Sequence, residues 1–163
     1  MAQTAGQLLD GAPRALDARV RTVWGTGALL STLVPGVAAT IVVAIVGAPG
    51  ALVGAAVLVT IVASITAFVW SQLAVTRWWW RAWPDALELH HGVAVVHESL
   101  VPYHRIQQVD IVRDPLERVL GLSTLVLRTA AATTDAKVPG VPVELAESLR
   151  QALLERAHVD DAV

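Results

Sequence analysis

The sequence predicts a membrane protein in which a two-helix transmembrane hairpin is followed by a small cytosolic α+β domain. Of the 163 residues, 55% are hydrophobic and only 16% are charged, and the mean hydropathy is +0.57. Soluble domains carry about 25% charged residues. The apolar excess is concentrated in residues 22–76, a run of 55 residues without Asp, Glu, Lys, Arg or His. Beyond Pro84 the pattern changes to short alternating apolar runs, which indicate a separate domain.

The uncharged run has no polar face, which a water-soluble helix would need. Residues 47–50 read Gly-Ala-Pro-Gly and favour a turn, so we expect helices at about 23–46 and 51–75, the first kinked at Pro35. At about 1.5 Å per residue, each exceeds the ~30 Å hydrocarbon core. A cleaved signal peptide is the alternative for the first helix. Its apolar stretch would be only about 7–15 residues long and would follow a basic start.

Basic residues flank the hairpin and are missing from its turn: Arg14, Arg19 and Arg21 precede it, and Arg77 and Arg81 follow it. By the positive-inside rule, both termini are expected in the cytoplasm. The chain is then expected to be a multi-pass membrane protein, with a cytoplasmic N-terminal segment (residues 1–21), the hairpin (22–76) and a cytosolic domain (77–163).

A Trp- and Arg-rich segment borders the hairpin, and aromatic rings of this kind favour the headgroup layer. Stacking on nucleic-acid bases is the alternative use of such a cluster, but the net charge of −2 argues against nucleic-acid binding. We therefore expect membrane-interface anchors at Arg21, Arg77, Trp78, Trp79, Trp80, Arg81 and Trp83.

The cytosolic segment begins with a predicted β-hairpin. Leu87 and Leu89 alternate with polar residues, His91-Gly92 supplies a turn, and Val93 and Val95 resume the apolar face. The sequence Val101-Pro102-Tyr103 then interrupts this pattern, and a third strand is expected from residue 105 to residue 113.

A short helix is expected next, because Asp114, Pro115 and Glu117 fit a capping box with Pro at the first helical position. Its apolar side would comprise Leu116, Val119 and Leu120, with Gly121 as the stop. Strands are expected at 123–129 and 137–141, with a loop at 130–135. An amphipathic helix is expected at 142–157, with Leu145, Leu149, Ala152 and Leu153 buried.

Two short motifs carry a family resemblance. The first reads, loosely, Pro-Tyr-x-Arg-Ile-Gln-x-Val, and the second reads Leu-x-Arg-x-x-Gly-Leu. Their residues are Pro102, Tyr103, Arg105, Ile106, Gln107 and Val109, then Leu116, Arg118 and Gly121. Together with the preceding hairpin, this pattern resembles the bacterial membrane-flanked PH-like domain family (YdbS-like proteins). The resemblance implies a PH-like split β-barrel closed by a C-terminal helix, on the cytoplasmic face of a bacterial plasma membrane. It also suggests a partner, a larger sibling with several such domains.

Structural roles are the competing interpretation of the motif residues. Arg118 would pair with Asp114 along the short helix, and Arg105 would brace Asp110 or a neighbouring strand. Gln107 and Gln108 would close backbone groups at a β-bulge, and Gly121 would simply end a helix. A binding role for these residues is the other hypothesis.

No catalytic, metal or cofactor site is expected. The chain has no cysteine, and His90, His91, His97 and His104 lack a recognised ligand spacing, so we interpret them as solvent-facing hairpin histidines. Glu88, Glu98 and Asp110 are carboxylates that nothing in the sequence places in a cleft. The sequence thus predicts a protein that is not an enzyme.

The distribution of charge along the chain distinguishes between the remaining candidate functions. From Pro84 onward there are 7 basic and 12 acidic residues, a net charge of −5, whereas the preceding part is +3. An acidic domain is a poor trap for anionic headgroups. We therefore expect a non-catalytic scaffold or assembly subunit whose partners are the lipid bilayer and a membrane protein, either the larger sibling or a second copy. An anionic-lipid-sensing module is the alternative, and a small transporter subunit is a third.

Overall fold

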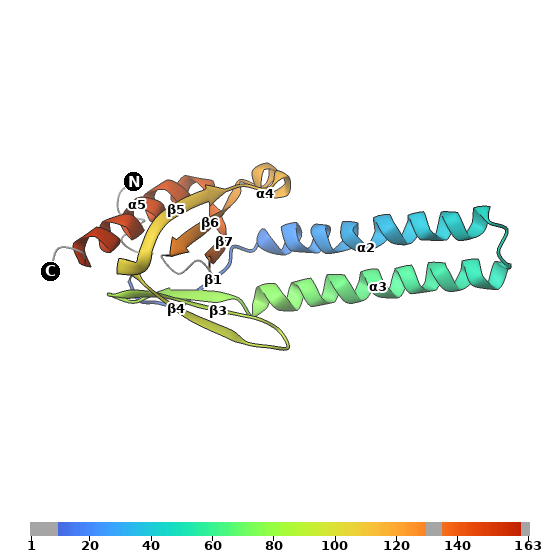
Figure 1. The fold of residues 1–163 in the computed structure, drawn as a ribbon, viewed down its shortest axis with the longest axis horizontal. Coiled ribbons are helices and arrows are strands. Elements are labelled where there is room, and N and C mark those ends of the chain that lie inside the picture. The colour runs from blue at the N-terminus through green and yellow to red at the C-terminus, as the bar shows by residue number, and fades with distance from the viewer. Residues whose placement is uncertain (1–9, 130–134, 161–163) are drawn as a thin grey trace. The chain divides into compact units, whose positions relative to one another are not determined.

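Two long helices form the hairpin expected from the uncharged run (Figure 1): α2 spans Val20–Ile45 and α3 spans Gly50–Thr76. The computed structural model describes residues 10–129 and 135–160. Both helices are long and apolar enough to cross a membrane, with mean hydropathies of 2.2 and 2.5. Pro35 lies inside α2 without ending it. Most of their large apolar side chains are exposed, as suits a surface that faces lipid.

Small residues let the two helices of the hairpin approach closely. A Cβ atom on Gly36 would overlap the side chain of Thr60, so only glycine fits at this crossing. Nearby, the hydroxyl of Thr32 donates a hydrogen bond to Ser64 Oγ at 3.1 Å, and Ser64 Oγ donates to the carbonyl of Thr60 at 2.8 Å. Close backbone approach and hydroxyl hydrogen bonds are how membrane helices associate where the hydrophobic effect is weak.

The second unit is a domain built from the residues on both sides of the hairpin, up to Val20 and from Thr76 onward. It holds two antiparallel sheets, a short helix and a long C-terminal helix. The four-stranded sheet has the order β1 (Arg14–Ala15), β2 (Trp79–Ala82), β3 (Ala86–His91), β4 (His97–Pro102). The three-stranded sheet has the order β5 (Ile106–Val112), β6 (Leu122–Thr129), β7 (Ala136–Pro142). The helices are α4 (Pro115–Val119) and α5 (Val143–Asp160).

The transmembrane hairpin is inserted between two neighbouring strands of this domain. Strand β1 precedes α2 in the chain, and β2 follows α3, yet β1 and β2 pair directly: Arg14 lies opposite Trp80, and Ala15 lies opposite Trp79. Neither strand was predicted from the sequence, because β1 is only two residues long and β2 lies in the Trp-rich segment interpreted as an interface anchor. With these two strands, the described residues contain seven strands of the PH-like domain.

The first predicted hairpin differs from the structure at its turn. Strand β3 continues to His91, which pairs with His97, so β4 begins later than expected. Val93 and Val95 therefore lie in a loop, not in a strand. Gly92 takes a φ of +122° and sits against the carbonyl of Val95, where a Cβ atom would clash. The connection between β3 and β4 is therefore a loop of residues 92–96, longer than the expected turn.

The remaining elements of the domain follow the expected pattern. Strands β5, β6 and β7 and helix α5 lie where the alternation predicted them, whereas most of the predicted loop, residues 130–134, lies outside the described residues. Helix α5 packs against the three-stranded sheet and the turn before β5, with Ala146, Leu149, Leu153 and Ala157 buried, while Leu145 and Ala152 of the predicted stripe are half-buried. Each fully buried Leu side chain contributes about 1.5–3 kcal/mol. The core thus lies between the sheets and α5.

Candidate functional site

Tyr103 lies at the centre of the first motif and is fully buried. It begins a 3₁₀ turn (Tyr103–Arg105) between β4 and β5. Its hydroxyl donates a hydrogen bond to the carbonyl of Trp83 at 3.1 Å, and Arg156 of α5 reaches the same carbonyl at 3.2 Å. The Arg156 guanidinium also stacks 5.5 Å above the Tyr103 ring. Burial raises the pKa of the Tyr103 hydroxyl, so it stays a donor that ties the four-stranded sheet to α5.

Other motif residues also define the fold. Ile106 and Val109 are buried in the core, and Pro102 ends β4 opposite Ala86. Gly121 takes a φ of +66°, a backbone conformation that L side chains rarely adopt, directly after α4. The structural roles of these residues explain much of the motif without a binding function.

Arg105, Gln107 and Arg118 are the exposed polar residues of the motif. Asp110, the expected partner of Arg105, is bound instead by Gln108 at 2.6 Å and Arg128 at 2.9 Å. These hydrogen bonds lower the pKa of the Asp110 carboxyl. Arg105 therefore does not brace Asp110, one of its two expected contacts.

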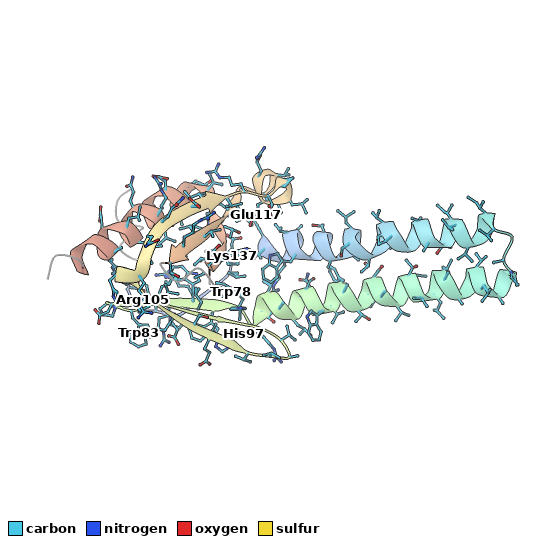
Figure 2. The ribbon with its side chains drawn as sticks, viewed as in Figure 1. Trp78, Trp83, His97, Arg105, Glu117 and Lys137 are labelled. Atoms are coloured by element: carbon cyan, nitrogen blue, oxygen red, sulfur yellow. The ribbon has the colours of Figure 1, made fainter. Side chains whose placement is uncertain are left out.

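The expected side-chain pair of Arg118 with Asp114 is also missing, and only a backbone hydrogen bond joins the two residues. Within residues 10–129 and 135–160, neither Arg105 nor Arg118 has an ion pair or a side-chain hydrogen bond. Figure 2 shows Arg105 at the opposite end of the domain from Glu117 of α4. The two arginines therefore do not form one basic pocket.

Helix α4 has the capping box that the sequence predicted, but its apolar residues point outward. The backbone N–H of Asp114 donates to Glu117 Oε2 at 3.1 Å, and the Thr124 hydroxyl donates to Glu117 Oε1 at 2.7 Å. Glu117 is thereby buried, whereas Leu116 is 36% exposed and Val119 is 82% exposed. The predicted apolar side of this helix is thus a surface feature.

The Trp-rich segment alternates across strand β2. Trp78 and Trp80 are each only 6% exposed. On the other face, the Arg81 guanidinium lies 5.7 Å from the Trp79 ring centre and 5.2 Å from that of Trp83. Burial in the sheet explains the positions of Trp78 and Trp80 without any contact with lipid. An interfacial role is therefore proposed only for the outward-facing Trp79, Arg81 and Trp83, and for Arg21 and Arg77.

The histidines of the β3–β4 hairpin form a stacked row with the tryptophans, so their interpretation as solvent-facing residues is only partly correct. The His91 ring lies 6.2 Å from Trp78 and 5.3 Å from His97 between ring centres. His91 Nδ1 is buried without a hydrogen bond in the described part of the chain. Burial, with the neighbouring His97 and His90, lowers the pKa of His91. Among the described residues, no three His, Asp or Glu side chains are grouped as metal ligands.

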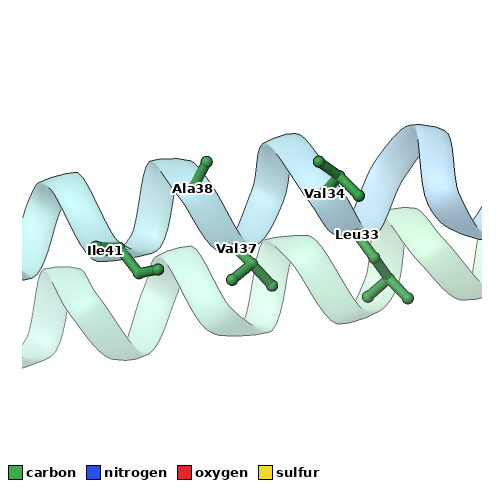
Figure 3. A pocket seen from close by; sticks show the side chains of 5 residues that line it. All are labelled: Leu33, Val34, Val37, Ala38 and Ile41. Carbon is green, nitrogen blue, oxygen red and sulfur yellow. The ribbon is translucent and has the colours of Figure 1, made fainter.

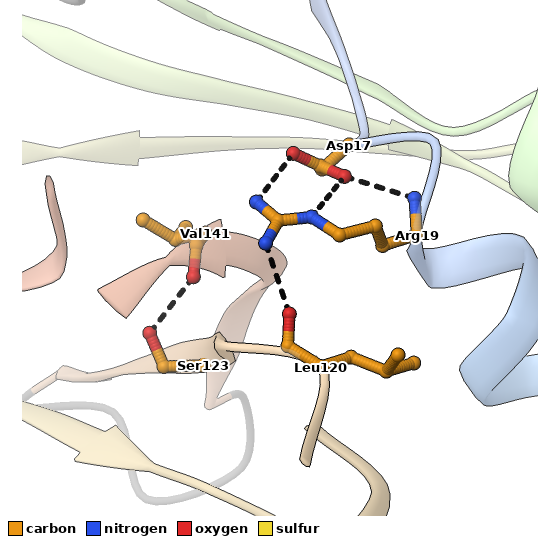
Figure 4. A network of polar contacts seen from close by, with 5 residues as sticks. All are labelled: Asp17, Arg19, Leu120, Ser123 and Val141. Carbon is orange, nitrogen blue, oxygen red and sulfur yellow. Dashed lines mark hydrogen bonds and ion pairs between the residues drawn. The ribbon is translucent and has the colours of Figure 1, made fainter. Parts of the chain in front are cut away.

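A polar network holds the segment before α2 against the domain (Figure 4). The Asp17 carboxylate accepts hydrogen bonds from the backbone N–H and the guanidinium of Arg19, at 2.8, 3.0 and 3.1 Å. These hydrogen bonds from Arg19 lower the pKa of Asp17. Arg19 Nη1 donates to the carbonyl of Leu120 at 2.9 Å, just beyond α4. Val20 is buried against Gly140, where a Cβ atom would overlap it.

A shallow groove on the hairpin has a volume of about 380 Å³ and only apolar lining (Figure 3). Its lining residues are Leu33, Val34, Val37, Ala38 and Ile41. A pocket without polar groups cannot orient a polar substrate. Lipid chains fit such a surface when the helix lies in a membrane.

Comparison with known proteins agrees with this architecture. A sequence model of the bacterial PH domain matches residues 29–157. The UPF0699 transmembrane protein YdbS of Bacillus subtilis (strain 168) is 29% identical over 97 residues, and the match spans 60% of this chain and 60% of that protein. No solved structure matches the chain. With two long apolar helices and an antiparallel domain that ends in a helix, the chain belongs to the bacterial PH domain family, as a membrane-anchored, YdbS-like member.

Proposed function

We propose that this protein is a non-catalytic scaffold or assembly subunit of a membrane complex. The hairpin anchors the PH-like domain in the bacterial plasma membrane, with both termini in the cytoplasm. The domain then docks a membrane protein partner, either a larger sibling with several PH-like domains or a second copy. Anchoring both proteins in one bilayer raises their effective concentration, so a modest interface is sufficient.

The observation that carries this proposal is the exposed edge strand β4. Among the residues that the structure describes, it is the last strand of its sheet and pairs only with β3. His97, Glu98 and Leu100 are exposed on it, and Leu100 is 63% exposed. An open edge offers backbone N–H and C=O groups to which a partner strand can add. Leu100 would supply the apolar contact within that interface.

The charge of the domain supports a protein partner. From Pro84 onward the net charge is −5, and the Glu98 side chain on the β4 edge is 70% exposed. A partner strand with basic residues would be attracted to this edge, whereas an anionic leaflet repels an acidic domain.

Site-specific crosslinking in native membranes tests the proposal. The chain has no cysteine, so Leu100→Cys gives a single thiol on the β4 edge, and Glu155→Cys gives a matched exposed thiol on α5. We expect a thiol-directed photocrosslinker at position 100 to yield one adduct of defined mass, which a label at position 155 does not. Recovery of only the uncrosslinked monomer at position 100 would contradict docking at this edge.

Anionic-lipid sensing is the second candidate. It is favoured by the guanidinium groups of Arg105 and Arg118, which have no ion pair with any residue that the structure describes. Native mass spectrometry of the full chain in detergent, titrated with short-chain phosphatidylglycerol and phosphatidylcholine, distinguishes lipid sensing from protein docking. Selective phosphatidylglycerol binding that is lost in Arg105→Gln or Arg118→Gln would support sensing. Equal binding of both lipids, unchanged by the substitutions, is the result expected for a protein-docking module.

A further inference from the structure

Two exposed apolar segments of the domain lack a role in the proposed docking. The first, the apolar loop, is residues 92–96, where Val95 is 66% exposed and Val96 is 51% exposed. The second, the apolar turn, comprises Val112 (45% exposed) with Leu116 and Val119 of α4. Adjacent exposed apolar residues are disfavoured in water and mark interaction surfaces.

Each segment is tied to a residue that borders a transmembrane helix. Arg77 directly follows the last residue of α3, and its Nη1 atom donates a hydrogen bond to the carbonyl of Val93 at 3.3 Å. Arg77 is also the first charged residue after the uncharged run, so it marks the headgroup level. The apolar loop, which begins beside this contact, must therefore start at the bilayer surface.

The apolar turn has an equivalent tether on the other side of the hairpin. Arg19 directly precedes the first residue of α2 and bonds the carbonyl of Leu120, the residue after α4. The next residue, Val20, is buried against Gly140 and fixes this arrangement. Val119 is thus one residue away from an anchor at headgroup level. Figure 1 shows α4 and the tip of the β3–β4 hairpin at the same end of the domain.

We infer that the apolar loop and the apolar turn insert into the interfacial layer of the bilayer that the hairpin spans. The occupant of this surface is lipid, because chain continuity places both tethers at the membrane boundary. Arg113 and Arg118 lie between the apolar residues of the turn in the sequence, and basic residues beside apolar ones are typical of segments that lie about 5–10 Å deep in the interface. The insertion fixes the orientation of the domain and leaves the β4 edge available.

Depth-dependent fluorescence quenching tests the inference on the full chain. Val95→Cys and Val119→Cys are single thiols at exposed positions, so neither substitution disturbs the core, and Glu155→Cys on α5 is the control. Each is labelled with an environment-sensitive fluorophore and reconstituted in nanodiscs at one chain per disc. Lipids with a nitroxide at acyl carbon 5 act as the membrane quencher, and aqueous iodide acts as the solvent quencher.

We expect blue-shifted emission and at least two-fold stronger lipid quenching at positions 95 and 119 than at position 155, with weak iodide quenching. Strong iodide quenching at 95 and 119, equal to that at 155, would overturn the inference. Protection that appears only in discs holding two chains would assign the surface to a second copy and would also overturn it. The docking proposal is tested separately by crosslinking at position 100. Failure of the insertion inference therefore does not count against docking at the β4 edge.

Discussion

Arg19 Nη1 donates a hydrogen bond to the carbonyl oxygen of Leu120 across 2.9 Å, although the two residues are 101 positions apart in the sequence. Arg19 leads into the first transmembrane helix, and Leu120 ends the short helix of the domain. With β1 paired to β2, this contact makes the N-terminal segment part of the PH-like domain. The chain segments that border the hairpin on both sides therefore belong to the same folded unit.

Replacing Arg19 with Gln should loosen α4 without unfolding the domain, because it removes the donor to Leu120 and the ion pair with Asp17 at 3.0 Å. Hydrogen–deuterium exchange of the peptide covering residues 115–122 should become faster. Arg21→Gln is the matched control, since it removes the same charge two residues further on and leaves the Leu120 contact in place. Equal exchange in both variants would show that the contact does not hold the segment.

Tyr103→Phe should lower the free energy of unfolding by about 1 kcal/mol, because it deletes one hydrogen bond to the carbonyl of Trp83. Tyr103→Ala removes the buried ring as well and should cost about 3–5 kcal/mol. Chemical denaturation of the domain, followed by tryptophan fluorescence, measures both. Val95→Ala serves as the control and should stay within about 0.5 kcal/mol of the parent, as is usual for surface positions.

Gly140→Ala should destabilise the domain by about 2 kcal/mol or more. Gly140 has a φ of +72°, and an added Cβ would overlap Val20, so backbone strain and overpacking act together. Combining it with Val20→Ala should recover the overpacking part and leave the strain. If the double variant is no more stable than Gly140→Ala, the close approach of the N-terminal segment to β7 is not as described here.

The stability of the domain should fall as the pH is lowered through about 6.5. His91 has a pKa below its ordinary value of 6.5, because burial and the neighbouring His97 and His90 disfavour its charged form. The unfolded state therefore binds a proton at a pH where the folded state does not, and acidification favours unfolding. Thermal unfolding between pH 8 and pH 5 should show this slope, and His91→Gln should flatten it. A slope unchanged by His91→Gln would assign the titration to other groups.

Much of the fold could be predicted because its signals are local. An uncharged run of 55 residues leaves little alternative to a membrane hairpin, and the capping residues of α4 lie within four positions of each other. Strand β1 could not be predicted, because two residues carry no periodicity and the pairing partner is separated by the whole hairpin. Strand β2 was missed because its tryptophans border the membrane, where the same residues suit an interface.

The site was less predictable than the fold, because exposure depends on tertiary contacts. Leu116 and Val119 have the spacing of a buried helix face, but the buried position of α4 is taken by Glu117, which is bound to Thr124. Only closeness in sequence indicated Asp110 and Asp114 as partners of Arg105 and Arg118. In the structure, Arg128 of the neighbouring strand takes Asp110 instead.

Affinity purification of the full chain in mild detergent from its native membrane tests the central claim, docking at the β4 edge. Leu100→Glu places a charge on that edge, and Gln151→Glu is the control that adds the same charge on the exposed face of α5. We predict that a membrane protein co-purifies in a fixed ratio with the parent and with Gln151→Glu and is lost with Leu100→Glu. Unchanged recovery of that protein with Leu100→Glu would contradict the account.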